Sequence, residues 1–265
     1  SAVYSDAKVT LPSIISDNMV LQQRSNVKIW GWSDPDAIIT ISVSWSKKTY
    51  TTYSGPDGKW SLHIKTPGES VGEKMKILSG STGEEIEISN ILIGEVWLAS
   101  GQSNMEFEMK PHPVDKWMTG MHEWEKESED ANYPYIHLFK VEEDYNHNAP
   151  QENCKGKWMV CTPEVARNCS AIAFLFAREL HTTLDTPVGV ILCAFGGTHA
   201  ESWTRSSIME NDSLYNKVYK SYSPDSDVCK KYPHKVPAAI WNAMVNPIVG
   251  YTIKGNIWYQ AESNA

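Results

Sequence analysis

Residues 95–105 read E-V-W-L-A-S-G-Q-S-N-M, and this stretch decides how the rest of the chain is interpreted. Its first half is bulky and apolar, as is typical of a strand buried in a parallel sheet. Its second half is small and polar, and Gly101 lets the backbone turn sharply at little steric cost. The stretch therefore predicts a strand that ends in a turn presenting Ser103, at the edge where α/β sheets bind ligands.

A glycine two residues before a serine is weak evidence of catalysis, because a loop with a capping serine has the same pattern. The spacing also differs from the G-x-S-x-G turn of many serine hydrolases, since Met105 stands where the second glycine would be. The interpretation of Ser103 as a nucleophile therefore depends on partners elsewhere in the chain.

The first 92 residues predict a small antiparallel β-sandwich. They are rich in β-branched and aromatic residues, alternate apolar with polar side chains, and show no helical period. Candidate strands cover residues 27–32, 39–43, 50–53, 60–64, 76–78 and 86–88, with a turn at Pro56-Asp57-Gly58. We expect this domain (residues 1–92) to be a packing accessory rather than a sugar-binding module in its own right.

From residue 93 to residue 265 the pattern changes to that of a parallel α/β domain. Residues 106–165 look irregular, apart from the acidic run 123–130, which fits a solvated helix face. Ser170 predicts a helix N-cap, and the apolar face of that helix is expected to contain Ile172, Leu175, Phe176 and Leu180. Apolar strands follow at residues 188–195 and 253–260, with a helix between them at residues 238–245, opened by Pro237.

The three predicted strands of this domain end in S-G-Q-S-N, G-G-T and Q-A-E-S-N. Because the carboxyl ends of parallel strands meet at one edge of a sheet, their end residues should lie close together. The residues expected there are Ser103, Gly196, Gly197 and Gln260. Acyl transfer needs such a set, because a serine oxygen attacks the carbonyl while backbone N–H groups and an amide stabilise the developing oxyanion.

The composition is that of an ordinary globular protein, with 265 residues, 41% of them hydrophobic and 21% charged. The formal net charge of -8 and the absence of a long basic run argue against a nucleic-acid partner. No apolar run reaches the ~18 residues of a membrane-spanning helix, and the start Ser1-Ala2-Val3 reads as a mature start without a signal peptide. Eleven Trp and 12 Tyr could stack on sugars, although core packing accounts for most of them.

Five cysteines form an odd number, and no C-x-x-C spacing predicts a zinc site. One disulfide among Cys154, Cys161 and Cys169 is an open alternative, and it would suit a secreted protein. Cys193 lies in an apolar run and is expected to be a buried thiol. We therefore expect no metal and no other cofactor.

Four motifs resemble, in the same order, those of the sialate O-acetylesterase family, which belongs to the SGNH (GDSL-like) hydrolases. They are G-Q-S-N-M at 101–105, F-G-G-T-H-A-E-S-W at 195–203, I-W-N-A-M-V-N-P at 240–247 and W-Y-Q-A-E-S-N at 258–264. The segments S-D-N-M-V-L-Q-Q at 16–23 and V-K-I-W-G at 27–31 also resemble the N-terminal β-domain of the family. The resemblance implies a three-layer α/β domain with a parallel sheet, here incomplete at its C-terminal side.

The resemblance also implies roles for individual residues in an esterase that removes O-acetyl groups from sugars without a metal. Ser103 would be the nucleophile. The oxyanion hole would consist of the Ser103 backbone N–H, a glycine of Gly196-Gly197 and the Gln260 side chain. The residues implied in loop orientation or substrate contact are Asn104, His199, Glu201 and Glu262.

Two departures from the family pattern matter. Ala261 stands where a glycine usually follows the glutamine, and alanine tolerates fewer backbone conformations. The histidine base of the family, in a D-x-x-H-like motif, has no counterpart here, and His199 is the best substitute among the eight histidines. The others lack a partner motif: His63, His112, His122, His137, His147, His181 and His234. We therefore expect a piece of a longer protein, nearly inert without its base.

Three functions stay open at this point. Sialic acid is the best-known substrate of the family, and acetylated plant polysaccharide such as xylan is the alternative used by related esterases. A carbohydrate-binding relative without turnover is the third possibility, because the base is missing. The expected partner is an acetylated sugar in each case, and the expected location is secreted, periplasmic or lysosome-like.

Overall fold

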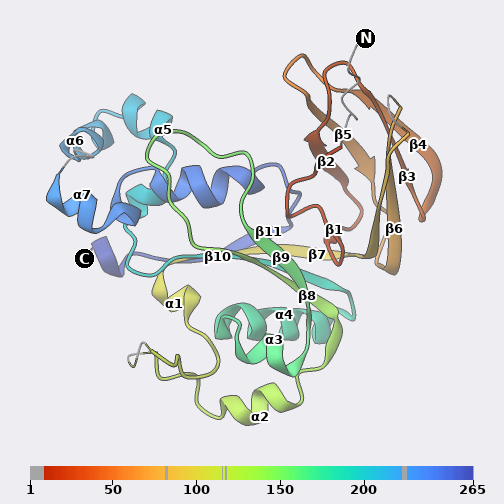
Figure 1. Cartoon of the computed structure of the whole chain (residues 1–265). Helices are drawn as coiled ribbons and strands as arrows, with labels where there is room; N and C mark the ends of the chain where they lie inside the picture. Colours follow the sequence, from red (N-terminus) through yellow and green to blue (C-terminus); the bar gives the residue numbers. More distant parts are fainter. Residues whose placement is uncertain (1–8, 81–82, 115, 117, 223–225, 265) are drawn as a thin grey trace.

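One long strand, β7 (Glu85–Gly101), connects the two halves of the molecule in this computed structural model (Figure 1). The structure describes residues 9–80, 83–114, 116, 118–222 and 226–264. The first part of β7 pairs antiparallel with β6 (Ser70–Ser79), and its last part pairs in parallel with β10 (Val188–Ala194) and β11 (Gly255–Tyr259). The domain boundary predicted near residue 92 falls inside this strand and stays a prediction.

The N-terminal half consists of antiparallel strands, as the alternating pattern predicts. β2 (Asn26–Trp32) pairs with β5 (Lys59–Lys65), and β3 (Ile38–Val43) lies between β4 (Ser46–Tyr53) and β6. A short strand that the pattern did not predict, β1 (Val20–Gln22), runs parallel to β7. The side chains buried between these strands include Ile29, Ile39, Ile41, Ile64 and Ile77.

The sheet of the second half has the order β11-β7-β10-β8-β9. Four of these strands are parallel, including β8 (Tyr133–Val141), whereas β9 (Gly156–Cys161) runs antiparallel at the edge. The fold is therefore mixed α/β. The expectation of irregular structure over residues 106–165 is wrong for β8 and β9. The polar residue His137 interrupts the apolar pattern of β8, yet it is buried, with its ring nitrogens on the carbonyl oxygens of Asn18 and Pro134.

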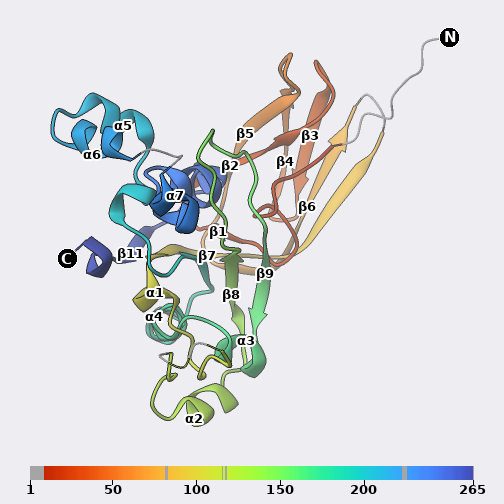
Figure 2. The ribbon, with the colours of Figure 1, turned by 60° about the vertical axis from the view of Figure 1, so that its left-hand side comes forward.

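Helices cover both faces of this sheet (Figures 1 and 2). Along β10, Val190 and Leu192 pack in the same cluster as Phe174 of α4 (Ala171–Leu184). The alternate residues Ile191 and Cys193 pack in the opposite cluster, with the segment around the π-helix η3 (Trp241–Val245). The carboxyl ends of the parallel strands therefore emerge between two helical layers.

Two predicted helices differ in detail from the sequence pattern. The Ser170 hydroxyl caps α4 by accepting a hydrogen bond from the Ala173 N–H at 3.1 Å, as predicted. The residues of α4 that are fully buried are Ala171, Ala173, Phe174 and Ala177, whereas Ile172, Leu175, Phe176 and Leu180 are only partly buried, since the small alanines let the helix lie close to the sheet. Ala238 has a φ of 63°, so Pro237 and Ala238 form a turn before the π-helix rather than its first residues.

The remaining short helices surround the sheet edge and its two flanks. They are α1 (Ser103–Glu106), α2 (Trp124–Glu129), α3 (Pro163–Arg167), η1 (Ala200–Trp203), α5 (Ser206–Asn211), α6 (Tyr215–Ser221), α7 (Asp227–Lys231), η2 (Pro233–Lys235), η4 (Asn246–Ile248) and η5 (Glu262–Asn264). Helix α2 confirms the helix predicted for the acidic run.

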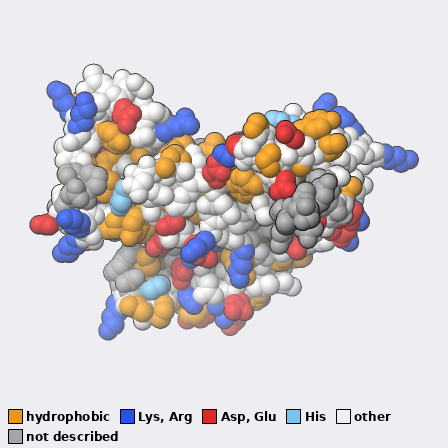
Figure 3. Space-filling model, turned by 45° about the horizontal axis from the view of Figure 1, so that its top comes forward, with side chains coloured by type: hydrophobic (Ala, Val, Ile, Leu, Met, Phe, Trp, Pro, Cys, Tyr) orange, Lys and Arg blue, Asp and Glu red, His pale blue; other side chains and the backbone are white. Residues whose placement is uncertain are grey.

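Seen from above, the surface dips between the lobe of α5, α6 and α7 and the β-rich lobe, and charges of both signs are scattered over this face (Figure 3). All five cysteines are free and buried, so the disulfide alternative is wrong. In the part of the chain that the structure describes, no helix combines the length and apolar character needed to span a membrane.

Candidate active site

Ser103 is the first residue of α1 and follows β7 directly, as the opening motif predicts. Gly101 has a φ of 143°, and a Cβ on it would lie 2.0 Å from the Tyr259 carbonyl oxygen. Only glycine therefore lets β7 and β11 approach so closely. The Gln102 N–H then donates to the Tyr259 carbonyl at 3.0 Å, which fixes the strand end just before the serine.

The glycine turn after β10 lies beside this serine. The Phe195 N–H donates to the Gly101 carbonyl at 3.1 Å, and a Cβ on Gly196 would lie 3.5 Å from the Ser103 Cβ. Gly197 has a φ of 69°, which favours glycine. The buried hydroxyl of Thr198 holds the turn, because it donates to the Phe195 carbonyl at 2.7 Å and accepts from the Trp203 indole at 2.8 Å.

Gln260, at the end of β11, connects the other two strand ends. Its Nε2 donates to the Thr198 carbonyl at 2.8 Å and to the Gln102 Oε1 at 3.0 Å. Both amide hydrogens of Gln260 are therefore used inside the protein. Its Oε1 is buried and accepts no hydrogen bond from any described residue, so it is the one atom of the Gln260 amide without a partner.

Glu262 fixes the direction of this chain of amides. Its two carboxylate oxygens accept from Gln102 Nε2 and from Asn104 Nδ2, both at 2.5 Å. Because the Gln102 amide nitrogen must point at the carboxylate, its oxygen points at Gln260. The structure thus places Asn104 and Glu262 in contact beside the serine turn, and the roles predicted for them in loop orientation or substrate contact stay predictions.

Asn264 ties the same segment to the loop that carries the second motif. Its Oδ1 accepts from the Ala200 N–H at 2.9 Å, and its Nδ2 donates to the Glu201 carboxylate at 2.9 Å. Glu201 thus contacts the third motif rather than the serine. Its contact supports a role in loop orientation, and a substrate contact stays a prediction.

Glu106 is a site residue that the sequence patterns did not single out. It lies three residues after Ser103, so both side chains share one face of α1. Its Oε2 accepts from the Gly196 N–H at 2.8 Å. The only signal in the sequence is this spacing, which has meaning once a helix is known to start at the serine.

The pKa of Glu106 is raised to about 8, first because burial removes hydration from the carboxylate form, and then because of a hydrogen bond to Glu143 and the charge of Glu143. The Gly196 N–H and the Lys140 ammonium act in the opposite direction. Both carboxyl groups line a cavity of about 240 Å³ together with Glu108 and Lys140, which form a 3.5 Å ion pair. Glu106 therefore stands between the glycine turn and a small polar cavity, and is neutral near pH 7.

Several backbone N–H groups beside the serine turn have no acceptor among the described residues, and two of them can serve an oxyanion at Ser103. They belong to Ser103 and Gly197, whereas the N–H of Gly196 is occupied by Glu106. Unpaired N–H groups next to a nucleophile are what an oxyanion requires. Within the glycine pair, Gly197 is therefore the better candidate donor in this conformation.

Two histidines lie near the glycine turn, and neither is hydrogen-bonded to Ser103. His199 Nδ1 lies 3.3 Å from the Tyr222 hydroxyl, and its pKa is lowered by burial and by the charge of Lys235. His234 stacks on Phe195 with ring centroids 5.0 Å apart. Its Nε2 lies 4.0 Å from the position of a Cβ on Gly197, and burial lowers its pKa as well. No sequence pattern singles out His234, because it lies in an irregular stretch.

The Ser103 hydroxyl has no hydrogen-bond partner among the described residues. The same part of the chain contains no group of three or more His, Cys, Asp and Glu side chains placed to hold a metal ion. The site therefore presents a serine, the unpaired N–H groups of Ser103 and Gly197, and a network of amides.

The family model described as carbohydrate esterase, sialic acid-specific acetylesterase, matches residues 93–265. Sialate O-acetylesterases from Homo sapiens and Mus musculus are 27% and 26% identical over 95% and 96% of this chain. These alignments cover 48% and 52% of the relatives, so the chain spans about half of their length. A solved carbohydrate acetylesterase from Xanthomonas citri matches with a TM-score of 0.80 and 26% identity, over 97% of this chain and 52% of that one. The chain thus belongs to the sialic acid-specific acetylesterase family of carbohydrate esterases.

Proposed function

We propose that this chain carries the nucleophile half of a serine esterase that removes O-acetyl groups from sialic acid. The observation that carries the proposal is the meeting of three strand ends at Ser103, through Gly196 and through the amide network of Gln102 and Gln260. Membership of the carbohydrate esterase family supports the same reaction.

In the proposed mechanism the Ser103 oxygen attacks the acetyl carbonyl, and the sugar hydroxyl leaves with a proton from the base. Water then hydrolyses the acetyl-enzyme and regenerates the serine. The N–H groups of Ser103 and Gly197 would donate to the oxyanion, and loss of one such donor typically costs about 100- to 1,000-fold in rate. Gln260 would contribute by holding the Thr198 carbonyl in place, and direct donation would require one of its two hydrogen bonds to break.

A neutral Glu106 suits this mechanism. A carboxylate beside the Gly196 N–H would oppose negative charge growing on the substrate oxygen, whereas a protonated carboxyl removes that repulsion. The cavity of about 240 Å³ that Glu106 lines is smaller than typical ligand sites, which are roughly 300–1,000 Å³, and Ser103 does not line it, so it is not the place of the reacting acetyl group.

The base is the missing part of the proposed mechanism. Because neither His199 nor His234 contacts the Ser103 hydroxyl, we assign the base to the histidine of the family's D-x-x-H-like motif, supplied by a segment outside residues 1–265. A serine without a base is a poor nucleophile at neutral pH, so the chain alone should turn over very slowly.

Acetate release from O-acetylated sialic acid and from acetylated xylan tests these statements. The comparison needs this chain, a longer protein that includes the histidine segment, and Ser103→Ala in both, with the exposed Ser207→Ala as control. Activity confined to the longer protein and lost in Ser103→Ala is expected. Activity of the short chain that depends on His234 or His199 would contradict the assignment of the base.

Two alternatives are separated by the same assay. Preference for acetylated xylan would assign a plant polysaccharide substrate. Sugar binding without acetate release by either protein would favour a carbohydrate-binding function without turnover. This alternative is worth testing because the Ser103 hydroxyl has no partner among the described residues. The proposed location is secreted, periplasmic or lysosome-like, on the strength of the family alone, since the free cysteines add no support.

A further inference from the structure

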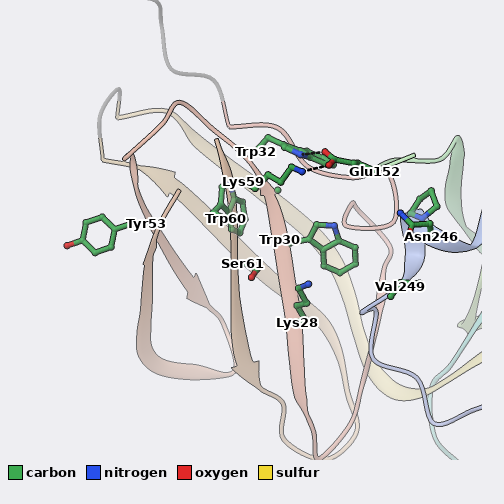
Figure 4. Close-up of a pocket in the computed structure, with 12 residues that line it drawn as sticks. Lys28, Trp30, Trp32, Tyr53, Lys59, Trp60, Ser61, Glu152, Asn246 and Val249 are labelled. Carbon is green, nitrogen blue, oxygen red and sulfur yellow. Dashed lines mark hydrogen bonds and ion pairs between the residues drawn. The ribbon is translucent and has the colours of Figure 1, made fainter. Parts of the chain in front are cut away.

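A groove of about 510 Å³ lies between strand β2 and the segment of η4, and none of the residues grouped around Ser103 lines it (Figure 4). Its volume is within the roughly 300–1,000 Å³ of small-molecule sites. It forms where the β-rich half meets the second half of the chain, so residues from both halves build it.

The floor of the groove is the outer face of β2. Along this strand Val27 and Ile29 are buried in the core, so Lys28, Trp30 and Trp32 occupy the opposite face and are half-buried. The Trp30 ring lies between β2 and the segment of Asn246 and Val249 in Figure 4. An edge-to-face contact with Tyr251, at 6.4 Å between centroids, holds the ring in place.

One end of the groove carries a charge cluster of Lys59, Glu152 and Asp57. Glu152 accepts from the Trp32 indole N–H at 3.1 Å and forms an ion pair with Lys59 (Figure 4). Lys59 also lies 3.6 Å from Asp57. Lys59 is thus shared between two carboxylates, so this end of the groove offers no free cation and keeps one excess negative charge.

The other groups in the groove have no partner. Lys28 has no ion pair with any described residue, and its ammonium lies 5.5 Å from the Trp30 ring centroid. Three more groups form no hydrogen bond with any described residue: the Trp30 indole N–H, the Ser61 hydroxyl and the Asn246 Oδ1. The other amide atom of Asn246, Nδ2, donates to the Gln151 carbonyl at 2.8 Å. An aromatic face is therefore surrounded by one free cation and several free hydrogen-bonding groups.

A further polar group in the lining is orphaned. Trp60 lines the groove and is only 3% exposed, yet its indole N–H has no partner among the described residues. A buried N–H without a partner costs stability, and such groups normally find an acceptor. The Trp60 side chain lies on the buried face of β5, opposite Lys59 and Ser61, so the donors open to the groove are those of Lys28, Trp30 and Ser61, which suit a ligand rich in oxygen.

We propose that this groove binds an acidic sugar unit, with its ring on Trp30 and its carboxylate on Lys28. A pyranose has one face of C–H groups, which suits an aromatic ring, and a rim of hydroxyls, which suits Ser61 and Asn246. A carboxylate gives Lys28 the partner that it lacks. The site is separate from the serine cluster and does not depend on the proposed mechanism.

The test is a titration of the ¹⁵N-labelled chain with N-acetylneuraminic acid and with its methyl ester, followed at the tryptophan indole resonances. We expect the acid to shift Trp30 with millimolar affinity, and the ester to bind about two- to fivefold more weakly, because an exposed ion pair is worth up to about 1 kcal/mol. Lys28→Gln should make the two affinities equal. Lys48→Gln is the matched control, because Lys48 also lies over an aromatic ring, that of Tyr50, outside the groove.

Trp30→Leu and Trp30→Phe also remove the indole reporter, so binding by these two variants is followed at the backbone amides of Lys28 and Ser61. Trp30→Leu should abolish the shifts there for both ligands, and Trp30→Phe should weaken binding of both while keeping the ring contact with Tyr251. The melting temperature of each variant identifies any loss of fold. Equal affinity for acid and ester in the unmodified chain, binding that survives Trp30→Leu, or shifts at Trp258 and Trp203 in place of Trp30 would each overturn the proposal. An unchanged titration in Ser103→Ala is expected, so failure of the serine mechanism would leave this result intact.

Discussion

The two flanks of Ser103 use the same residue type in opposite environments. On one flank the carboxylate of Glu262 is exposed and accepts two amide hydrogen bonds, from Gln102 and Asn104. On the other flank Glu106 is largely buried, and burial together with Glu143 keeps it protonated near pH 7. The comparison teaches that hydration decides the charge of a glutamate here: Glu262 is an anion that accepts from two amides, and Glu106 is neutral, which in the proposed mechanism spares the oxyanion.

The largest effect is expected from Gly101→Ala, which would disturb both flanks at once. The new Cβ would lie 2.0 Å from the Tyr259 carbonyl, so β7 and β11 would have to separate. We expect a loss of more than about 3 kcal/mol in the free energy of unfolding, measured by denaturant titration.

Gly72→Ala is the matched control for this change. Gly72 also has a positive φ, of 69°, but a Cβ there meets nothing within 4 Å. Backbone strain alone should cost it about 1–2 kcal/mol. Equal losses in the two variants would show that the contact with β11 does not determine the stability of the serine turn.

Glu262→Ala should have the next largest effect, and mainly on the reaction. Its loss leaves the Gln102 and Asn104 amides without an acceptor, so the amide network loses its fixed direction. We expect kcat/KM for acetate release by the active form of the protein to fall about 10- to 100-fold. Stability should change less, because Glu262 is exposed.

Glu262→Gln separates the hydrogen bonds from the charge. A glutamine oxygen can still accept from one of the two amides, so this variant should retain more activity than Glu262→Ala. Equal activity of Glu262→Ala and the unmodified protein would show that the amide network does not position the serine.

Glu106→Gln should change how stability depends on pH. An acid whose pKa is raised in the folded state, from 4.5 to about 8, makes the folded state hold a proton that the unfolded state has lost. Its contribution is therefore fully present below about pH 4.5 and is lost as the pH rises to about 8, with a slope of at most about 1.4 kcal/mol per pH unit. Denaturant titrations between pH 5 and pH 9 should show this slope reduced in Glu106→Gln and unchanged in the exposed Glu164→Gln.

The same variant should alter the pH profile of acetate release. Ionisation of Glu106 above about pH 8 places an anion beside the oxyanion, so the rate should decline there in the unmodified enzyme. Glu106→Gln should remove this alkaline decline. A decline of the same size in both proteins would rule out Glu106 as its source.

The smallest effect is expected from Glu143→Gln, and it is measured as a change in the pKa of Glu106. The glutamine keeps a hydrogen-bond acceptor and removes the charge, so the pKa of Glu106 should fall yet stay above its ordinary value, because burial is the first cause of the shift. Carbon-13 NMR of the Glu106 carboxyl measures this pKa without any turnover. A pKa that does not move would show that Glu143 does not act on Glu106.

The strand ends could be predicted because each motif shows where a strand stops, and the topology of a parallel sheet shows which strand ends lie together. An apolar run followed by small polar residues predicts a strand end, and parallel strands place their ends at one edge. This reasoning brought Ser103, Gly196 and Gln260 together correctly. It could not find Glu106 or His234, because their positions depend on where a four-residue helix begins and how a long loop folds back.

Strand β8 and the buried residues of α4 could not be predicted, because tertiary contacts decide which of their side chains are buried. Strand β8 escaped the pattern because His137 is polar in sequence, yet is buried by backbone acceptors that lie 119 and three residues away. The apolar face predicted for α4 does pack against the core, but the most buried residues, among them Ala173 and Ala177, were not predicted because alanine carries little hydrophobic signal. In both cases the tertiary contact outweighs the local pattern.

The long strand β7 limits where insertions and deletions can occur in proteins with this fold. Ile88 and Ile91 are both buried although they are three residues apart, because Asn90, with a φ of 54°, takes up one extra residue between them. A single insertion or deletion elsewhere in β7 would turn every side chain on one side of it to the opposite face. Sequences that share this architecture should therefore change the length of β7 only in steps of two residues, or by gaining and losing a bulge.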